Sequence, residues 1–251
     1  MKKLMVGFVL VGVLLGAAGC GGSDEPAASA GPALSKDEFS GKVQAALQGK
    51  KTFHLETVTT DSDGPGTFVT DVRLDGKGAD VSGSAMGTSV VRIGGTLYGK
   101  GAQLSNNPAK PWVKHDPAAK GAGKDTSALM AGAMLQLLSP QLDQYLVVAG
   151  APYATEFSSA PGDTIDGAAT TKYKMTVDVV KATGAKAFGT YLTPETAGQS
   201  QLTTLPIEIS VDADALPRSF SYEAEGAKIE GKFSKFGDPL TITAPAADQI
   251  A

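Results

Sequence analysis

The chain has 251 residues, of which 42% are hydrophobic and 19% charged, which is enough for one large domain or two small ones. Its 22 Lys and Arg and 26 Asp and Glu give a net charge of -4, without the basic excess that nucleic-acid binding requires. One Cys and two His exclude an intrachain disulfide and leave little room for zinc or His-based catalysis. The 31 Gly and 14 Pro favour a turn-rich all-β or α+β fold.

The N-terminus is typical of a secretory signal peptide. Two lysines precede an apolar segment, residues 4–15, and small residues follow immediately before Cys20. These three zones define a signal peptide, and the apolar segment is shorter than the ~18 residues of a spanning helix. The chain's one cysteine directly follows the small residues, as in a bacterial lipobox. A lipobox usually has Leu three positions before the cysteine, where this chain has Ala17.

The lipobox implies a lipid anchor. Its cysteine receives a diacylglyceryl group and becomes the first residue after cleavage, and two acyl chains anchor a protein stably where one does so marginally. Residues 21–33 are small and polar and predict a flexible tether. We therefore expect a signal peptide over 1–19, lipidated Cys20 and tether over 20–33, and a domain over 34–251, anchored to the outer face of the cell membrane. The alternative is an ordinary signal peptide followed by an unmodified cysteine.

The domain begins with a predicted helix and continues with strands. Ser35 and Glu38 fit a capping box, and apolar residues then recur at helical spacing up to Gly49. Alternation with period two follows, and tight turns at Asp75-Gly76 and Gly94-Gly95 join only antiparallel neighbours. The predicted strands cover residues 52–60, 68–74, 77–85, 89–93 and 96–98.

The middle of the chain breaks this pattern. Residues 101–126 predict a long loop with Trp112 docked on the domain. Residues 127–138 predict a helix that is apolar nearly all round, and Pro140 separates it from a second short helix over 142–148. Several polar residues in this region exclude a membrane span.

The second half returns to alternation, with a short helix or loop over 179–190. Strand–helix–strand repeats are missing from the sequence, which disfavours a parallel sheet. We expect an α+β fold with a single curved antiparallel sheet of about ten or eleven strands, a half-open barrel, and helices packed on its concave face. The predicted strands cover residues 154–165, 172–179, 207–212, 220–223, 228–235 and 240–242.

A series of short motifs in the second half resembles a known family. Together with the lipobox and the capped first helix, the order of these motifs resembles the actinobacterial lipoproteins of the LppX/LprA/LprF/LprG type, over most of residues 34–245. The resemblance implies a LolA/LolB-like fold with a hydrophobic cavity, lipid or glycolipid binding and lipid transport through the cell envelope. It implies no catalytic residues. The motifs are Asp166-Gly167, Thr171-Lys172-Tyr173, Val177-Asp178, Leu205-Pro206, Val211-Asp212, Leu216-Pro217-Arg218, Phe236-Gly237-Asp238-Pro239 and Ala244-Pro245.

Catalytic and metal-binding motifs are lacking in the sequence. It has no G-x-S-x-G, P-loop or H-E-x-x-H. The string Asp61-Ser62-Asp63-Gly64 resembles the start of a calcium loop but lacks the remainder, so we interpret it as a hairpin turn. His54 is predicted to lie in a strand and His115 in a loop, with nothing to orient either as a base. We expect a monomer that is not an enzyme and holds no metal or cofactor.

The apolar helix is the segment that points to a function. Met side chains adapt to apolar ligands of varied shape, although an all-round apolar helix is also typical of a buried core. We expect a carrier of lipid or glycolipid; the alternatives are a structural or signalling lipoprotein with a filled core that binds a protein partner, and a secreted hydrolase. A cavity of several hundred Å³ between 127–149 and the sheet would favour the carrier. The candidate pocket residues are Leu129, Met130, Met134, Leu137, Leu138 and, at the mouth, Trp112.

Overall fold

The computed structural model describes residues 31–76, 78–85, 87–116 and 126–251. The predicted signal peptide, Cys20 and most of the tether lie outside these residues. The helices are α1 (Lys36–Lys50), α2 (Thr126–Leu138), the 3₁₀ helix η1 (Ser139–Tyr153), α3 (Val179–Gly184), α4 (Pro194–Gln199) and the 3₁₀ helix η2 (Ala247–Gln249). The strands are β1 (Thr52–Asp61), β2 (Gly64–Leu74), β3 (Ala79–Ala85), β4 (Thr88–Ile93), β5 (Thr96–Lys100), β6 (Trp112–His115), β7 (Ala154–Ile165), β8 (Ala168–Asp178), β9 (Thr204–Asp212), β10 (Pro217–Ala224) and β11 (Ala227–Ser234).

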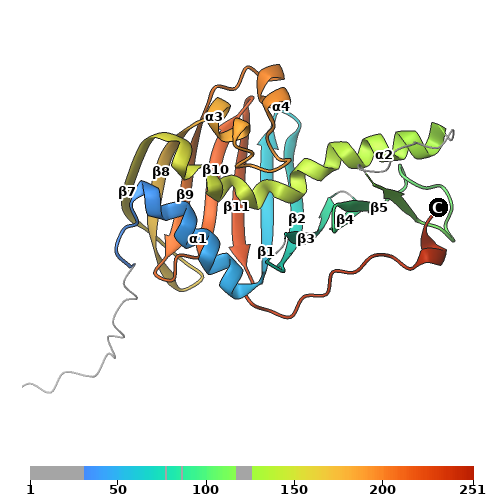
Figure 1. Ribbon diagram of the computed structural model, residues 1–251, viewed down its shortest axis with the longest axis horizontal. Coiled ribbons are helices and arrows are strands. Elements are labelled where there is room, and N and C mark those ends of the chain that lie inside the picture. The colour runs from blue at the N-terminus through green and yellow to red at the C-terminus, as the bar shows by residue number, and fades with distance from the viewer. Residues whose placement is uncertain (1–30, 77, 86, 117–125) are drawn as a thin grey trace, which may run out of the picture.

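All these strands form one antiparallel sheet (Figure 1). The spatial order is β6-β5-β4-β3-β2-β1-β11-β10-β9-β8-β7, so each half of the chain is a meander. The two meanders join where β1 pairs with β11, for example at Leu55 opposite Phe233. The sheet is not closed, because β6 and β7 are its two edges. This confirms the predicted single curved antiparallel sheet and its number of strands.

The hydrophobic core lies between the sheet and the helices. Figure 1 shows α1, η1 and α2 on one side of the sheet, which we call the inner face; the opposite side is the outer face. Phe39 of α1 packs edge-on against Tyr173 of β8, with ring centroids 4.8 Å apart. At the joint between the meanders, the rings of Phe53 and Phe233 lie 5.8 Å apart. The predicted capping box of α1 is confirmed, because the Ser35 amide donates to the Glu38 carboxylate at 3.2 Å.

The two predicted helices in the middle of the chain form one continuous helical cover. Pro140 falls where α2 ends and η1 begins, because proline lacks the amide that an α-helix would use there. The second helix is longer than predicted and has 3₁₀ geometry over its 15 residues.

Two sequence predictions at the β6 edge are wrong. Trp112 does not lie in a loop but begins β6, which pairs with β5; a strand of four residues is too short for its alternation to be recognised. The predicted strand over 240–242 is not formed. An alternation of three residues occurs in any extended segment, and Pro239, next to it, has no amide to donate to a neighbouring strand. The C-terminal segment instead crosses to β6, where the Ala251 amide donates to the Trp112 carbonyl at 2.8 Å.

Candidate functional site

Helix α2 is apolar both on the side that packs against the sheet and on the side that is exposed to solvent. Leu135 is fully buried, and it lies so close to β5 that a Cβ on Gly99 would come within 2.1 Å of its Cδ2. The opposite side of α2 carries large apolar residues in contact with solvent, which we call the apolar stripe. Its members are Leu129, Met130, Met134 and Leu137, which are 47%, 68%, 36% and 78% exposed.

The predicted pocket residues therefore lie in two different environments. The four residues of the apolar stripe face solvent. Leu138, at the end of α2, is half-buried against the core. Trp112 is half-buried on β6, where it forms a bridge to Ile250. The six residues do not line any of the hollows described below.

Closely packed side chains fill the space between the inner face and the helical cover at several points. A Cβ on Gly83 would come within 2.6 Å of the Phe68 ring and 2.8 Å of Leu142 Cδ2. Glycines inside strands often mark such close approaches, so Gly83 and Gly99 were the sequence signal for where the cover packs. At these points the helices and the sheet are in direct contact.

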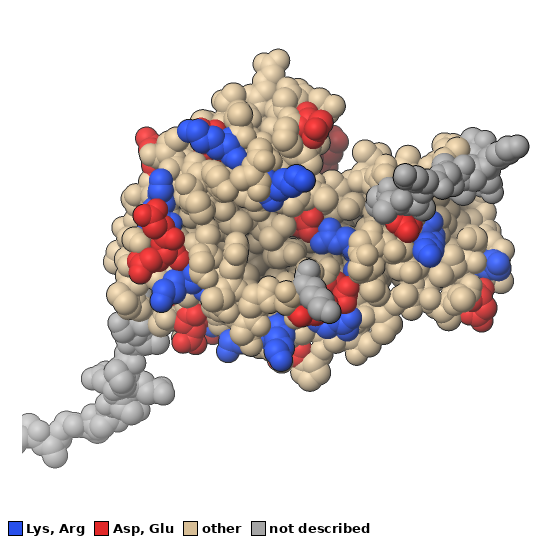
Figure 2. Space-filling model, in the orientation of Figure 1, with Lys and Arg blue, Asp and Glu red and all other residues tan. Residues whose placement is uncertain are grey.

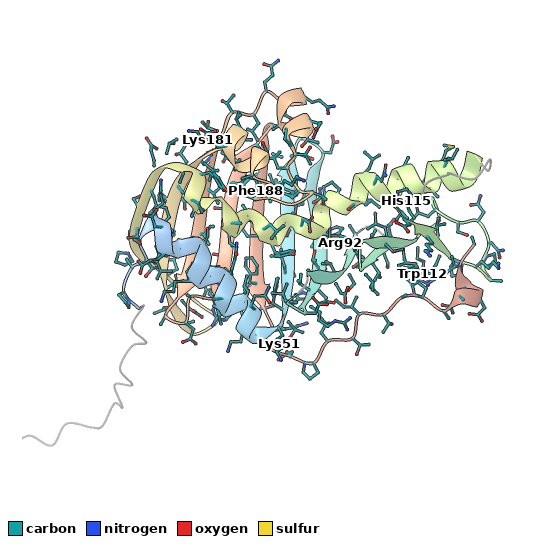
Figure 3. All side chains as sticks on the ribbon, in the orientation of Figure 1. Lys51, Arg92, Trp112, His115, Lys181 and Phe188 are labelled. Atoms are coloured by element: carbon teal, nitrogen blue, oxygen red, sulfur yellow. The ribbon has the colours of Figure 1, made fainter. Side chains whose placement is uncertain are left out.

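A buried ion pair links the sheet to its cover. Arg92 lies on the inner face of β4, in the same row as Val81 and Leu97, beneath the helices (Figure 3). Its Nη2 donates to Asp143 Oδ1 of η1 at 2.5 Å, and the two side chains are 15% and 5% exposed. The other oxygen, Asp143 Oδ2, accepts hydrogen bonds from the amide and the hydroxyl of Thr190, at 2.9 and 2.7 Å.

This ion pair is a site that the sequence did not reveal. Alternation along β4 places Val90 and Arg92 on one face but does not say which face is buried. The buried face of β4 is identified only by its register with the neighbouring strands. Val90 lies opposite Gly83 and Gly99, the two glycines on which the cover packs, so the face that carries Val90 and Arg92 is the inner one.

Arg92 and three buried tyrosines have shifted pKa values. Burial by itself lowers the pKa of Arg92, but the hydrogen bond and charge of Asp143 outweigh it and raise that pKa. Burial and the neighbouring Asp143 raise the pKa of Tyr145 to about 12. Burial also raises the pKa values of Tyr191 and Tyr222, whose hydroxyls are in contact. The site therefore keeps its arginine charged and its tyrosines neutral.

These tyrosines predict a loss of stability at alkaline pH. An unfolded Tyr ionises near pH 10, whereas Tyr145 holds its proton to about pH 12, so the folded chain binds more protons between these values. The free energy of unfolding should be insensitive to Tyr145 below pH 10 and should fall by about 2 kcal/mol by pH 12. Urea unfolding at a series of pH values measures this, and Tyr145→Phe should make the decline shallower. An equally steep decline in the variant would contradict the assignment to Tyr145.

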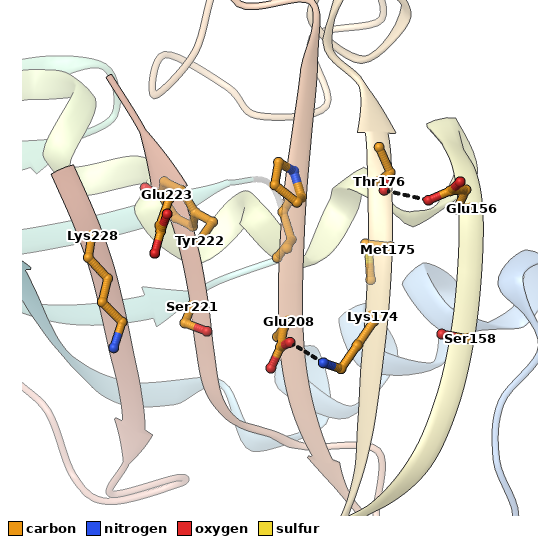
Figure 4. A pocket seen from close by; sticks show the side chains of 12 residues that line it. Glu156, Ser158, Lys174, Met175, Thr176, Glu208, Ser221, Tyr222, Glu223 and Lys228 are labelled. Carbon is orange, nitrogen blue, oxygen red and sulfur yellow. Dashed lines mark hydrogen bonds and ion pairs between the residues drawn. The ribbon is translucent and has the colours of Figure 1, made fainter. Parts of the chain in front are cut away.

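The largest hollow that we describe lies on the outer face and has charged and apolar side chains along its lining. It has a volume of about 490 Å³. Lys174 pairs with Glu208 at 2.5 Å, and the Thr176 hydroxyl donates to Glu156 at 3.0 Å; Figure 4 marks both contacts. A second hollow of about 390 Å³ adjoins it and shares Glu208 and Ser221. The larger hollow lies on the face away from the helical cover, and charged side chains such as Lys174, Glu208 and Lys228 line it beside Met175 and Ile207, so we do not place the lipid candidate site here.

The remaining polar candidates have structural partners. His54 Nδ1 lies 2.8 Å from Asp71 Oδ1 on the neighbouring strand. His115 lies on β6 instead of in a loop, and its Nε2 is 3.0 Å from Gln136 Nε2 of α2. Asp61 and Gly64 pair at the end of the β1–β2 hairpin, which confirms the turn. In the described part of the chain, three or more potential metal ligands do not cluster, and no helix is long and apolar enough to span a membrane.

Comparisons with known proteins support the fold. No protein-family model and no curated protein sequence matches the chain. Among solved structures, LprF from Mycobacterium bovis aligns with a TM-score of 0.51 and 19% identity, over 84% of this chain and 98% of that one. The Mycobacterium tuberculosis lipoprotein LppX aligns with a TM-score of 0.50 and 15% identity, over 83% of this chain and all of that one. The chain therefore has the fold of the LprF and LppX lipoproteins, as the sequence resemblance predicted.

Proposed function

We propose that the protein is a non-enzymatic lipoprotein, anchored through Cys20 to the outer face of the cell membrane, that binds a lipid or glycolipid and carries it through the envelope. Its acyl chains would lie between the inner face and the cover formed by α2 and η1. The observation that carries this proposal is the all-round apolarity of α2, whose Leu135 is buried while Leu137 is 78% exposed. The likeness to LprF and LppX supports the fold that such binding would use.

The apolarity of α2 makes it suited to cover an acyl chain in more than one position. The interior is packed where Gly83 and Gly99 meet the cover, so a chain can enter only if α2 and η1 move from the sheet. Residues 126–138 include no charged side chain, so either side of α2 could face the ligand without burying a charge. Each methylene transferred from water would contribute ~0.8 kcal/mol. Leu129, Met130, Met134, Leu137, Leu138 and Trp112 remain our candidates for this cover.

The packed interior also favours a second candidate function. If the contacts at Gly83 and Gly99 persist in solution, the domain has a filled core, and the apolar stripe would bind a protein partner. The protein would then be a structural or signalling lipoprotein.

Native mass spectrometry distinguishes the two functions. The chain beginning at residue 21, which keeps every described residue and lacks the lipidation cysteine, would be purified from a lipid-containing host. A carrier should retain lipid adducts that Met134→Glu reduces and Val180→Glu does not, because Val180 is an exposed apolar residue of α3. A folded parent chain that never holds lipid would overturn lipid binding and favour the filled core.

The proposed anchor predicts the effect of one substitution. Cys20→Ser should abolish incorporation of labelled fatty acid, because Cys20 is the chain's one thiol. The domain should stay folded, because the tether separates it from the anchor. Metabolic labelling followed by gel analysis measures incorporation, and circular dichroism checks the fold. Undiminished labelling of the variant would show that Cys20 is not the attachment site.

A further inference from the structure

We propose that the apolar stripe of α2 is a membrane-docking surface, which inserts into the outer leaflet of the bilayer to which the domain is tethered. This inference rests on the proposed anchor at Cys20 and is separate from lipid binding inside the domain. It assigns the exposed side of α2 to the membrane surface, whereas the proposed function concerns a ligand between α2 and the sheet.

The geometry of the stripe suits shallow insertion. Met130, Met134 and Leu137 are spaced i, i+4 and i+7, so their side chains project from one side of the helix, and together they span ~10 Å of its length. Contiguous exposed apolar surface on a monomer commonly marks an interaction site. Interfacial helices bury such a side ~5–10 Å into the boundary between headgroups and acyl chains.

The tether is long enough to allow this contact and short enough to favour it. From Cys20 to Gly31 are eleven residue steps, which reach at most ~40 Å. Gly31 lies against Ala213, next to β9, and the eleven strands place the sheet edges ~50 Å apart. A membrane along the helix side can therefore hold the anchor and meet α2. Confinement by the anchor raises the local concentration of α2 at the membrane and adds to whatever affinity the stripe has by itself.

The charge on the helix side is compatible with the same orientation, with Asp37 and Glu38 in the first turn of α1 and lysines towards its other end. Lys42 and Lys50 of α1 are exposed, as is Lys51 at its C-terminus, and Figure 3 shows Lys51 at the end of α1 on the helix side. Figure 2 shows broad uncharged areas on this side among scattered charges. Each lysine near an anionic leaflet contributes ~1 kcal/mol. The outer face carries acidic and basic side chains together, with Glu208 paired to Lys174 and Glu230 paired to Lys228.

The composition of the stripe argues against the other occupants. Two Leu and two Met side chains are much less than the ~800 Å² that each partner contributes to a standard protein interface. The stripe has no Trp, Tyr or Arg, the residues that dominate binding energy between proteins. A lipid surface requires neither a large area nor such anchors.

Vesicle sedimentation tests this inference. The chain beginning at residue 21 would be mixed with vesicles of phosphatidylcholine and phosphatidylglycerol. We expect it to partition onto them, and Met130→Glu with Leu137→Glu to lower the partition coefficient at least tenfold. Val180→Glu, the matched control, should leave the partition coefficient unchanged. Circular dichroism would confirm that each variant is folded.

Three results would overturn the docking surface: no partitioning of the parent chain, equal partitioning of the double variant and the control, or a stripe-dependent dimer in sedimentation velocity without vesicles. Native mass spectra of the same samples separate this inference from the proposed function. Stripe-dependent vesicle binding by a chain that never holds a lipid adduct would leave docking intact and overturn interior lipid binding. Lipid adducts on a parent chain that does not partition onto vesicles would overturn docking and leave interior lipid binding intact.

Discussion

Asp143→Ala should lower the free energy of unfolding by about 3–5 kcal/mol, because it leaves the buried guanidinium of Arg92 without its partner. The pair is separated by 2.5 Å, and the Arg92 side chain is 15% exposed. The substitution also removes the acceptor of both Thr190 hydrogen bonds. Urea unfolding of the chain beginning at residue 21 measures the loss.

Two further variants test whether the loss of stability comes from the burial of the Arg92–Asp143 ion pair. Lys174→Ala removes the partner of Glu208 from an equally short ion pair whose side chains are 61% and 41% exposed, and it should cost less than about 1 kcal/mol. Arg92→Met with Asp143→Leu replaces the buried pair by apolar groups and should recover much of the stability. Equal losses for Asp143→Ala and Lys174→Ala would show that the Arg92–Asp143 pair is not buried in solution.

Leu135→Ala should destabilise the domain by about 2–5 kcal/mol, whereas Leu137→Ala should change stability by less than about 0.5 kcal/mol. The same atoms are removed from the same helix in both variants, but Leu135 is fully buried and Leu137 is 78% exposed. Leu135 also occupies the space above Gly99, so its loss leaves a cavity between α2 and β5. Thermal and urea unfolding measure the difference, and similar losses would show that the structure assigns the sides of α2 wrongly.

The sequence predicts most of this fold because its signals are local. Two-residue turns such as Asp75-Gly76 and Gly94-Gly95 fix antiparallel neighbours, and the Ser35 capping box fixes the start of α1. The features it did not predict depend on contacts between distant segments. Strand β6 is held in place by β5, by α2 and by the C-terminal residues, not by its own four residues.

The candidate site was predicted less completely than the fold. The apolarity of 127–138 identifies a functional helix, but an all-round apolar pattern cannot show which side packs, so the exposure of Met130 and Leu137 could not be foreseen. Arg92 was missed for the related reason that alternation along a strand does not identify the buried face. Asp143 lies in the helix predicted over 142–148 and has no charged neighbour in sequence, so it gave no sign of its partner.

Photo-crosslinking tests the central claim, that an acyl chain lies between α2, η1 and the inner face. A lipid with a photoreactive group on its acyl chain would be bound to the chain beginning at residue 21, in detergent-free buffer without vesicles, and the modified residues identified by mass spectrometry. We expect modification of side chains that are buried in this structure, such as Leu135, Leu142 and Phe68, because they line the space that the ligand would enter. Modification confined to the outer face of the sheet, for example to Lys174 and Glu208, would contradict the claim.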